Sequence, residues 1–297
     1  MSKQSQSDQM RSGNGFIAAL DHSGGSTPNA LKLYGIDADS YSSDAEMYDL
    51  IHAMRSRIVQ APSFNGDRVV AAILFENTMD REIGGKPSAA YLWDDRGVIP
   101  FLKIDNGLKD ASDGVRLLKP IDGQDAILGR AVDASIYGTK MRSVIDAASP
   151  SGIAANVAQQ FDLARTILTH GLMPIVEPEI TISISDKAEA EQILLAELGK
   201  NLDALPEGQQ VMLKLTLPDT PNLYHPLLQH DGIMRIAALS GGYSRAEACE
   251  KLAQNGGVIA SFSRALTEGL SAQQSETEFN EILDSTIGQI YAASVAG

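Results

Sequence analysis

The sequence predicts an α/β fold, a (β/α)₈ TIM barrel in a single domain, from three observations. Eight short apolar segments follow one another along the chain, and segments of helical periodicity separate several of them. No low-complexity linker divides the chain after residue 15. The length of 297 residues is one that such barrels often reach as a single domain. Strands that alternate with helices in this way are typical of a closed, parallel sheet.

Each element is predicted from an apolar run or a helical pattern. Residues 1–14 are polar and rich in Gly, Ser and Gln, so we expect a flexible N-terminal arm before a barrel of residues 15–297. The predicted strands span residues 16–20, 69–75, 99–104, 135–141, 173–176, 211–216, 233–239 and 258–262. The predicted helices span residues 44–59, 153–170, 186–202, 245–255 and 278–293.

Glycines support two of the helix boundaries. Gly171 follows the second predicted helix and Gly256 follows the fourth, where a glycine commonly ends a helix. An open, doubly wound sheet is the alternative architecture. It is weakened because no Gly-x-Gly-x-x-Gly follows the first predicted strand.

The composition argues against several classes of partner. Lys and Arg total 24 and Asp and Glu total 38, so the net charge is −14, which disfavours nucleic acid and anionic membranes. The apolar runs are far shorter than the ~20 residues of a membrane helix. Cys249 is the only cysteine, which suits a reducing, cytoplasmic location. Five scattered histidines give little support for a metal site, and no cofactor is expected.

The predicted strand 211–216 carries a lysine at an unusual place. Side chains alternate across a strand, so one apolar face includes Leu213 and Leu215, while Lys214 points into the barrel. Desolvation there disfavours the charged form and lowers the pKa of the amine. A partly neutral lysine can attack a carbonyl and form a Schiff base. The alternative is an edge-strand lysine that reaches solvent.

Further polar side chains follow or end other strands. Glu177 and Glu179 lie two residues apart, so they share a face, and crowding raises the pKa of at least one of them, which suits general acid/base catalysis. Lys140 and Arg142 have the same spacing, which suggests a phosphate or another oxyanion. The alternatives are loop acids in solvent for the first pair and an ion pair of the barrel core for the second.

Loops with Gly, Ser and Arg follow the first, seventh and eighth predicted strands. The first loop begins with Asp21-His22 and continues into a Gly/Ser segment whose backbone amides can wrap a phosphate. Ser240-Gly241-Gly242 follows the seventh strand and Ser263-Arg264 the eighth, where barrels often bind phosphate. A plain glycine turn and a surface arginine are the alternative. Because neighbouring residues on a strand face opposite ways, we interpret His22 as a packing or loop residue.

Taken together, these segments resemble class I fructose-bisphosphate aldolase, the Schiff-base type, in its bacterial form without the C-terminal tyrosine tail of the animal members. The resemblance runs from about residue 16 to residue 266 and is specific in the order and spacing of its parts. The segments that carry it are ALDHS at 19–23, ILFE at 73–76, GVIPFLKID at 97–105, PIVEPE at 174–179, LK at 213–214, LSGG at 239–242 and SRAL at 263–266.

The resemblance implies a set of catalytic residues. Lys214 would form the Schiff base with the ketose, and Glu177 would act as the acid/base, with Glu179 as its partner near Lys214. Asp21 would orient the C4 hydroxyl, and Lys140 would stabilise charge at the reacting hydroxyls. In the animal members a C-terminal tyrosine is credited with proton transfer at C3, and Tyr291, in a predicted helix, is the nearest candidate here.

The resemblance also implies two phosphate sites for a small-molecule sugar phosphate. Ser240, Gly241 and Arg264, with Gly242 beside them, would hold the first phosphate. The residues implied at the other phosphate are Ser23, Ser26, Lys103 and Arg142. The implied reaction is the reversible cleavage of fructose 1,6-bisphosphate to dihydroxyacetone phosphate and glyceraldehyde 3-phosphate.

Two other functions stay open at this point: a Schiff-base aldolase for another phosphorylated sugar, and a non-catalytic barrel that binds sugar phosphates. Barrels of this kind often associate, so a homo-oligomer is also open. The cations at predicted strand ends include Lys103, Lys140, Arg142, Lys214 and Arg264, and a protonated His22 would add a sixth. We therefore expect a positive potential confined to one mouth of an otherwise acidic barrel.

Overall fold

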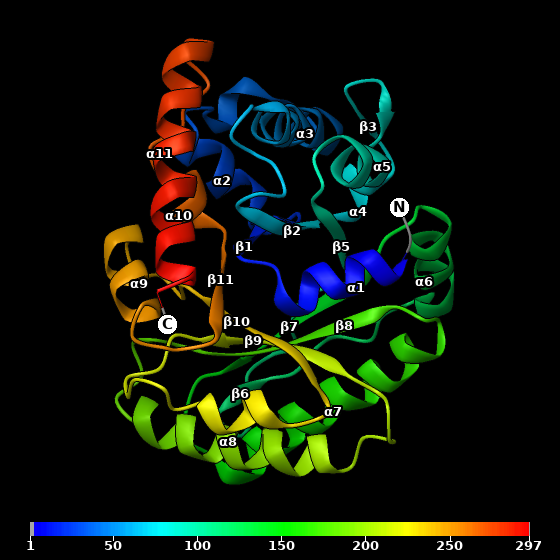
Figure 1. Cartoon of the computed structure of the whole chain (residues 1–297), viewed down its shortest axis with the longest axis vertical. Coiled ribbons are helices and arrows are strands. Elements are labelled where there is room, and N and C mark those ends of the chain that lie inside the picture. The colour runs from blue at the N-terminus through cyan, green and yellow to red at the C-terminus, as the bar shows by residue number, and fades with distance from the viewer. Residues whose placement is uncertain (1–2, 297) are drawn as a thin grey trace.

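Eight parallel strands close into a ring in the computed structural model, which describes residues 3–296 (Figure 1). Each strand pairs with the next in the order β1, β2, β5, β7, β8, β9, β10 and β11, and β11 pairs with β1. The closed ring confirms the predicted (β/α)₈ barrel and excludes the open sheet. The strands of the ring are β1 Phe16–Leu20, β2 Val69–Leu74, β5 Ile99–Lys103, β7 Gly138–Ile145, β8 Met173–Ile180, β9 Val211–Thr216, β10 Ile233–Leu239 and β11 Val258–Phe262.

Helices surround the ring, and short elements decorate its loops. The helices are α1 Lys3–Ser12, α2 Thr27–Leu33, α3 Asp44–Gln60, α4 Glu76–Met79, α5 Ser88–Ala90, α6 Gln124–Asp133, α7 Pro150–Thr169, α8 Lys187–Asp203, α9 Arg245–Leu252, α10 Arg264–Thr267 and α11 Glu276–Ser294. The short strands are β3 Glu82–Ile83, β4 Lys86–Pro87 and β6 Val115–Arg116, and the single helical turns are η1 Ala38–Ser40, η2 Tyr91–Asp95 and η3 His225–Gln229. Within residues 3–296, no helix is long and apolar enough to cross a bilayer.

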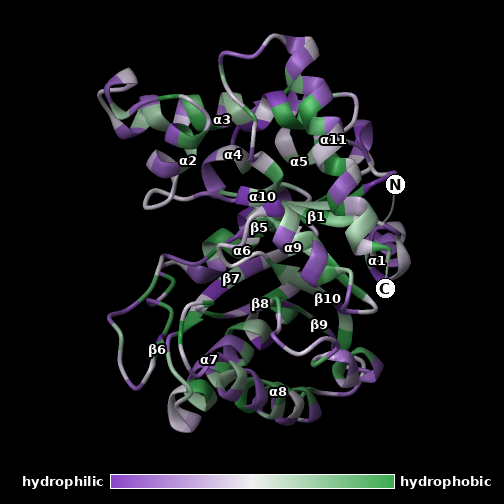
Figure 2. Cartoon of the chain, turned by 90° about the vertical axis from the view of Figure 1, so that its left-hand side faces the viewer, coloured by the Kyte–Doolittle hydropathy of each residue, from purple (hydrophilic) through white to green (hydrophobic). Residues whose placement is uncertain are grey.

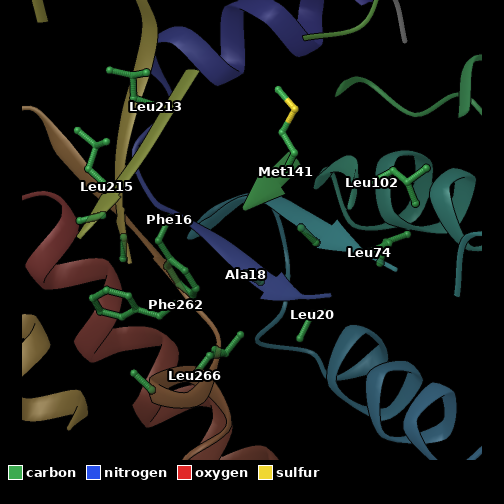
Figure 3. Close-up of a cluster of buried hydrophobic side chains, with 14 of the residues drawn as sticks. Phe16, Ala18, Leu20, Leu74, Leu102, Met141, Leu213, Leu215, Phe262 and Leu266 are labelled. Carbon is green, nitrogen blue, oxygen red and sulfur yellow. The ribbon is translucent and has the colours of Figure 1, made fainter. Parts of the chain in front are cut away.

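Alternating side chains divide the core into two layers. On β1, Phe16, Ala18 and Leu20 point outward into the layer between the strands and the helices, where Figure 3 draws them among other buried hydrophobic side chains. Ile17 and Ala19 point inward and pack inside the ring. The helices α7 and α8 show both hydrophobic and hydrophilic stretches in Figure 2, as expected for helices with one buried face.

Two strands extend further than the sequence pattern indicates. β7 runs to Ile145 and β8 to Ile180, whereas the predictions ended near residues 141 and 176. Both strands continue through charged side chains that face the inside of the barrel, while the outer face of β8 stays apolar and that of β7 carries Ser143, which is hydrogen-bonded to Asn156 of α7. The charged residues of β7 and β8 therefore stand on rigid strands rather than in loops.

Residues 3–12, which the composition led us to expect in a flexible arm, instead form helix α1. Met10 is fully buried in the inner layer of the core. Gln9 donates hydrogen bonds to the carbonyls of Val70 (3.2 Å) and Gly97 (2.7 Å), and Arg235 donates to the carbonyl of Met10 (3.3 Å). These partners lie at the amino-terminal ends of strands. Helix α1 closes that end of the barrel, so the expectation of a loose arm is corrected for these residues.

The last helix also ends at the amino-terminal side of the barrel. The hydroxyl of Ser294 accepts a hydrogen bond from the backbone amide of Ala260 in β11 (3.0 Å). Tyr291 lies one turn earlier on α11 and packs partly buried against the outer core. The side chain singled out as the nearest tyrosine candidate for proton transfer therefore does not lie at the carboxyl ends of the strands.

Candidate active site

One cavity of about 560 Å³ opens at the carboxyl ends of the strands. Every residue that the sequence analysis assigned to catalysis or phosphate binding lines it. These residues are Asp21, Ser23, Ser26, Lys103, Lys140, Arg142, Glu177, Glu179, Lys214, Ser240, Gly241, Gly242 and Arg264. They come from seven of the eight strands of the ring or the loops that follow them, so the closed ring brings together segments that are far apart in the sequence.

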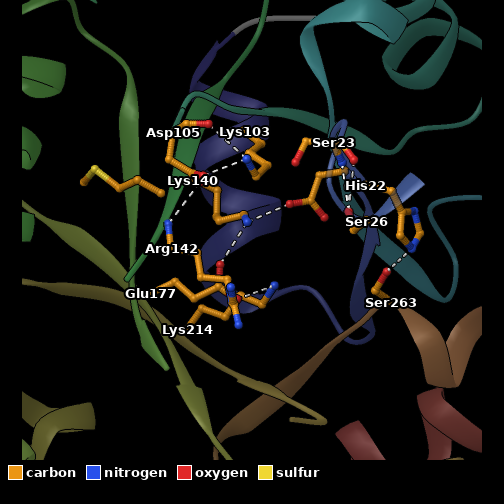
Figure 4. Close-up of polar contacts among 12 residues, drawn as sticks. His22, Ser23, Ser26, Lys103, Asp105, Lys140, Arg142, Glu177, Lys214 and Ser263 are labelled. Carbon is orange, nitrogen blue, oxygen red and sulfur yellow. Dashed lines mark hydrogen bonds and ion pairs between the residues drawn. The ribbon is translucent and has the colours of Figure 1, made fainter. Parts of the chain in front are cut away.

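A chain of buried ion pairs occupies the floor of the cavity (Figure 4). The ammonium of Lys140 lies 2.6 Å from Asp21 Oδ2 and 2.9 Å from Glu177 Oε2. The other carboxylate oxygen of Glu177 lies 2.9 Å from Lys214 Nζ. All four side chains are at most 10% exposed. Glu177 thus joins the two lysines through ion pairs, one on each of its carboxylate oxygens.

Strand alternation places Lys214 where the sequence predicts it. Leu213 and Leu215 belong to the outer layer of the core, while Met212, which shares a face with Lys214, belongs to the inner layer. The prediction that Lys214 points into the barrel is therefore confirmed. Lys214 is 5% exposed, which contradicts the alternative of a lysine that reaches solvent.

Burial and neighbouring charge act in opposite directions on the floor. Burial alone would raise the pKa of Asp21, but the ammonium groups of Lys140 and Lys214 hold that pKa well below its usual range. Burial would likewise lower the pKa of Lys140, and the carboxylates of Asp21 and Glu177 raise it instead. Asp21 is therefore a carboxylate and Lys140 an ammonium at neutral pH.

Glu179 differs from what the family resemblance implies. Its carboxylate pairs with the guanidinium of Arg142, not with Lys214. The register explains the difference: β8 pairs with β9 through Val176 and Leu213, so the next residues, Glu177 and Lys214, are level. Glu179 stands two residues higher on β8, about 6.6 Å further along the strand. Glu177 is therefore paired with Lys140 and Lys214, and Glu179 with Arg142.

Lys103 and Asp105 form a third pair at the edge of the floor. Lys103 Nζ lies 2.7 Å from Asp105 Oδ1, and the second oxygen of Asp105 accepts a hydrogen bond from the backbone amide of Arg142 (3.1 Å). Lys103 is directly opposite Lys140 in the β5–β7 ladder. Asp105 and Asp21 supply the negative charge that allows these two lysines to stand side by side.

The cavity rim carries the groups predicted to hold phosphate. Gly241 and Gly242 have φ values of +59° and +121°, which L side chains rarely adopt, so glycine is required at this turn. Arg264 is exposed, and within residues 3–296 it has no ion pair. On the opposite side of β11, the Ser26 hydroxyl accepts a hydrogen bond from the backbone amide of Ser23 (3.1 Å). An arginine without a carboxylate partner is available to an anion.

The charge of the lining differs from that of the whole chain. Five Lys and Arg side chains line the cavity against four Asp and Glu side chains, whereas the full sequence has a net charge of −14. His22, which was expected as a sixth cation, carries no positive charge. Burial, followed by the nearby charge of Arg55, lowers the pKa of His22 to about 4, so the imidazole is neutral. The expectation of a protonated His22 is corrected.

Comparison with known proteins agrees with the sequence resemblance. Residues 4–221 match the family described as fructose-bisphosphate aldolase class-I. The chain is 55% identical over 292 residues to fructose-bisphosphate aldolase class 1 of Synechocystis, an alignment that covers 98% of this chain and 97% of that protein. The chain belongs to the class I fructose-bisphosphate aldolase family.

Solved structures show the same barrel. A Plasmodium falciparum fructose-bisphosphate aldolase has a TM-score of 0.76 at 20% identity, with 99% of this chain and 94% of that chain covered. A second solved structure is an archaeal fructose-1,6-bisphosphate aldolase whose catalytic lysine is bound to a carbinolamine intermediate. It has a TM-score of 0.55 at 12% identity, and the match covers 98% of this chain and all of the archaeal chain. At these identities the likeness establishes the fold of this family member and nothing about individual residues.

The cavity of this class I aldolase family member also contains residues that the sequence analysis did not assign. Ser261 lines it from the end of β11, and Asn29 and Leu33 line it from α2. The alternating pattern of β11 could have indicated Ser261, which shares the inward face of that strand with Ile259. No sequence signal identifies the α2 residues. Within residues 3–296, no three His, Cys, Asp or Glu side chains are arranged to hold a metal ion.

Proposed function

We propose that this chain cleaves fructose 1,6-bisphosphate reversibly to dihydroxyacetone phosphate and glyceraldehyde 3-phosphate through a Schiff base on Lys214. One observation carries the proposal: an inward-facing lysine, 5% exposed, lies 2.9 Å from a buried carboxylate inside a cavity lined by further cations. A lysine nucleophile beside a base is the arrangement that imine catalysis requires.

Imine formation begins with the pair formed by Lys214 and Glu177. Lys214 gives a proton to Glu177, and its neutral amine attacks the C2 carbonyl of the open-chain ketose to form a carbinolamine. Glu177 then returns the proton to the carbinolamine hydroxyl, which leaves as water, and a protonated imine remains. The short distance between the two groups allows one carboxyl to serve both proton transfers.

Carbon–carbon cleavage uses the imine as an electron sink. Asp21 or Glu177 accepts the proton of the C4 hydroxyl, the C3–C4 bond breaks, and its electron pair moves into the imine to form an enamine. Glyceraldehyde 3-phosphate leaves. Lys140, held between the two carboxylates, stabilises the negative charge that develops at the reacting oxygen. Protonation of the enamine at C3 and hydrolysis of the imine then release dihydroxyacetone phosphate and regenerate the lysine.

The ends of the substrate are anionic, and the rim of the cavity supplies donors for both. We assign one phosphate to Ser240, Gly241 and Arg264, whose turn exposes backbone amides beside an arginine without a carboxylate partner. The loop that contains Ser23 and Ser26 is assigned to the other phosphate. Arg142 and Lys103 line the same cavity, and their charges are partly balanced by Glu179 and Asp105.

Borohydride trapping tests the proposal. Reduction of the enzyme in the presence of fructose 1,6-bisphosphate should attach the substrate carbon covalently to Lys214, as located by peptide mapping. Lys187 is a matched control in the same digest, because it is also a buried lysine (4% exposed) but pairs with Glu191 outside the cavity. Absence of any adduct, together with loss of activity on addition of EDTA, would show that the imine mechanism is wrong.

A cytoplasmic location forms part of the same proposal. It is supported by the single cysteine of the sequence, which allows no intrachain disulfide and is typical of proteins in a reducing compartment.

A further inference from the structure

Two serines at helix starts behave differently from the others in the described part of the chain. Ser43, Ser149, Ser244 and Ser275 each accept a hydrogen bond from the third residue of the helix that they precede. Ser26 and Ser263 hold the same position before α2 and α10, but neither side chain caps its helix. Only these two of the six line the cavity.

The hydroxyl of Ser263 is directed to His22 instead. Ser263 Oγ lies 2.9 Å from His22 Nε2, across the junction between the ends of β11 and β1 (Figure 4). The backbone carbonyl of Ser263 still accepts the amides of Leu266 (3.1 Å) and Thr267 (3.2 Å), so α10 begins normally without its side chain. The turn thus holds Ser263 in place while its hydroxyl is free for another purpose.

His22 is a neutral partner. Burial and the charge of Arg55 lower its pKa to about 4, and Arg55 is fixed nearby because it donates a hydrogen bond to the His22 carbonyl (2.6 Å). A neutral imidazole carries one N–H. Nε2 faces Ser263, whereas Nδ1 is buried without a hydrogen-bond partner. The position of the single ring proton therefore decides which atom donates in the contact with Ser263.

The two tautomers present different faces to the cavity. With the proton on Nε2, His22 donates to Ser263 Oγ, and the serine proton is free to donate to a ligand. With the proton on Nδ1, Ser263 must donate to His22, and only oxygen lone pairs remain for the cavity. Beside the loop of Ser23 and Ser26, to which one phosphate of the proposed substrate is assigned, lone pairs would repel the anion. A phosphate therefore favours the Nε2–H form.

We propose that His22 is a positioning residue that orients the Ser263 hydroxyl as a donor to the phosphate assigned to the Ser23–Ser26 loop, which follows His22 directly, and that this pair raises the selectivity for the bisphosphate over the monophosphate. The inference rests on the proposed function, and it concerns residues to which the family resemblance assigns no role. A neutral imidazole lets the site gain a donor without another positive charge, so the balance of five cations and four anions in the lining is unchanged.

Comparison of two substrates tests the pair. Fructose 1-phosphate lacks the phosphate at C6, which we assign to the Ser23–Ser26 loop. Because a hydrogen bond to a charged group changes affinity by about tenfold or more, Ser263→Ala should lower kcat/KM for fructose 1,6-bisphosphate about tenfold through KM. It should leave kcat/KM for fructose 1-phosphate within about twofold. Ser263→Thr retains the hydroxyl and should restore most of the selectivity, and Ser285→Ala on the exposed face of α11 is the control.

A double-variant cycle tests the role of His22. His22→Phe removes the nitrogen that holds Ser263 and should reduce the bisphosphate selectivity, but it should have little further effect in the Ser263→Ala background. Equal losses with both substrates, or losses of the two variants that add, would overturn the proposal, because a purely structural role affects both substrates alike. Loss of turnover with every substrate and absence of borohydride adduct in the wild-type protein would instead count against the proposed function.

A spectroscopic measurement is independent of turnover. In the Lys214→Met variant, which cannot form the imine, nitrogen-15 NMR of the histidine side chains with fructose 1,6-bisphosphate bound should show His22 as the Nε2–H tautomer. His22→Gln assigns the signal among the five histidines of the chain. An Nδ1–H tautomer in that complex would overturn the proposal even if the substitutions at Ser263 prevented folding.

Discussion

Replacement of Lys140 by methionine is the sharpest test of the ion-pair floor. Methionine has nearly the length and volume of lysine, so Lys140→Met removes the charge and leaves the packing nearly unchanged. Glu177 keeps Lys214 at 2.9 Å. Asp21, whose side chain is 10% exposed, loses its ion-pair partner at 2.6 Å. The substitution therefore isolates the cost of one buried carboxylate without a direct cation.

The size of the effect follows from burial. Removal of one partner of a buried ion pair typically destabilises a protein by about 3–5 kcal/mol. An unfolding entropy of about 2.1 cal/mol/K per residue over 297 residues amounts to about 0.6 kcal/mol/K. The expected loss in Tm is therefore about 5–8 °C at neutral pH.

The loss should depend on pH with a defined sign. In the wild type, Lys140 holds the pKa of Asp21 below its usual value, so this contribution to stability is fully present above about pH 4 and is lost as the pH falls through the lower folded-state pKa. In the variant, fewer cations oppose the effect of burial, so the pKa of Asp21 should rise. At low pH the buried Asp21 side chain can then take up a proton and become a neutral carboxyl. The gap in Tm between the two proteins should widen from pH 5 to pH 8.

Thermal unfolding followed by circular dichroism or calorimetry at several pH values measures this gap. Lys200→Met is the matched control, because Lys200 is 72% exposed and its contact with Glu197 is 3.4 Å, a surface pair worth about 0–1 kcal/mol. A gap of less than 1 °C for Lys140→Met, or one that grows as the pH falls, would refute the account of the floor as a buried network held together by Lys140.

Two further predictions concern the closed end of the barrel and the proposed acid/base. Met10→Ala leaves a cavity at a fully buried position beneath the strands and should lower the free energy of unfolding by about 2–5 kcal/mol, which a denaturant titration measures. KM should stay unchanged, because the substrate cavity lies at the other end of the barrel. A variant as stable as the wild type would show that α1 does not contribute to the core. Glu177→Gln removes the carboxylate beside Lys214 and should slow borohydride trapping with substrate by about 10²–10⁴-fold. Circular dichroism serves as the folding control. Trapping at the wild-type rate would rule out Glu177 as the group that carries the proton.

Local sequence predicted the strands and their faces because strand alternation is a local property. Lys214 stands between Leu213 and Leu215, and that period of two is sufficient to turn it inward whatever the rest of the chain does. The same rule predicted that Glu177 and Glu179 share one face of their strand and that Lys140 and Arg142 share one face of theirs. Composition misled at residues 3–12, because α1 packs through Met10 and otherwise uses polar side chains to bond the carbonyls of strand ends.

The sequence by itself determined the eight-stranded barrel, the inward direction of the site residues and their kinds. Only the tertiary structure decided which charges meet. Glu177, not Glu179, reaches Lys214 because β8 and β9 pair in one register, and Ser263 reaches His22 because β11 closes the ring on β1. Alternation depends on adjacent residues, whereas register and closure depend on hydrogen bonds between strands far apart in the chain. For that reason the faces can be read from the sequence and the partners cannot.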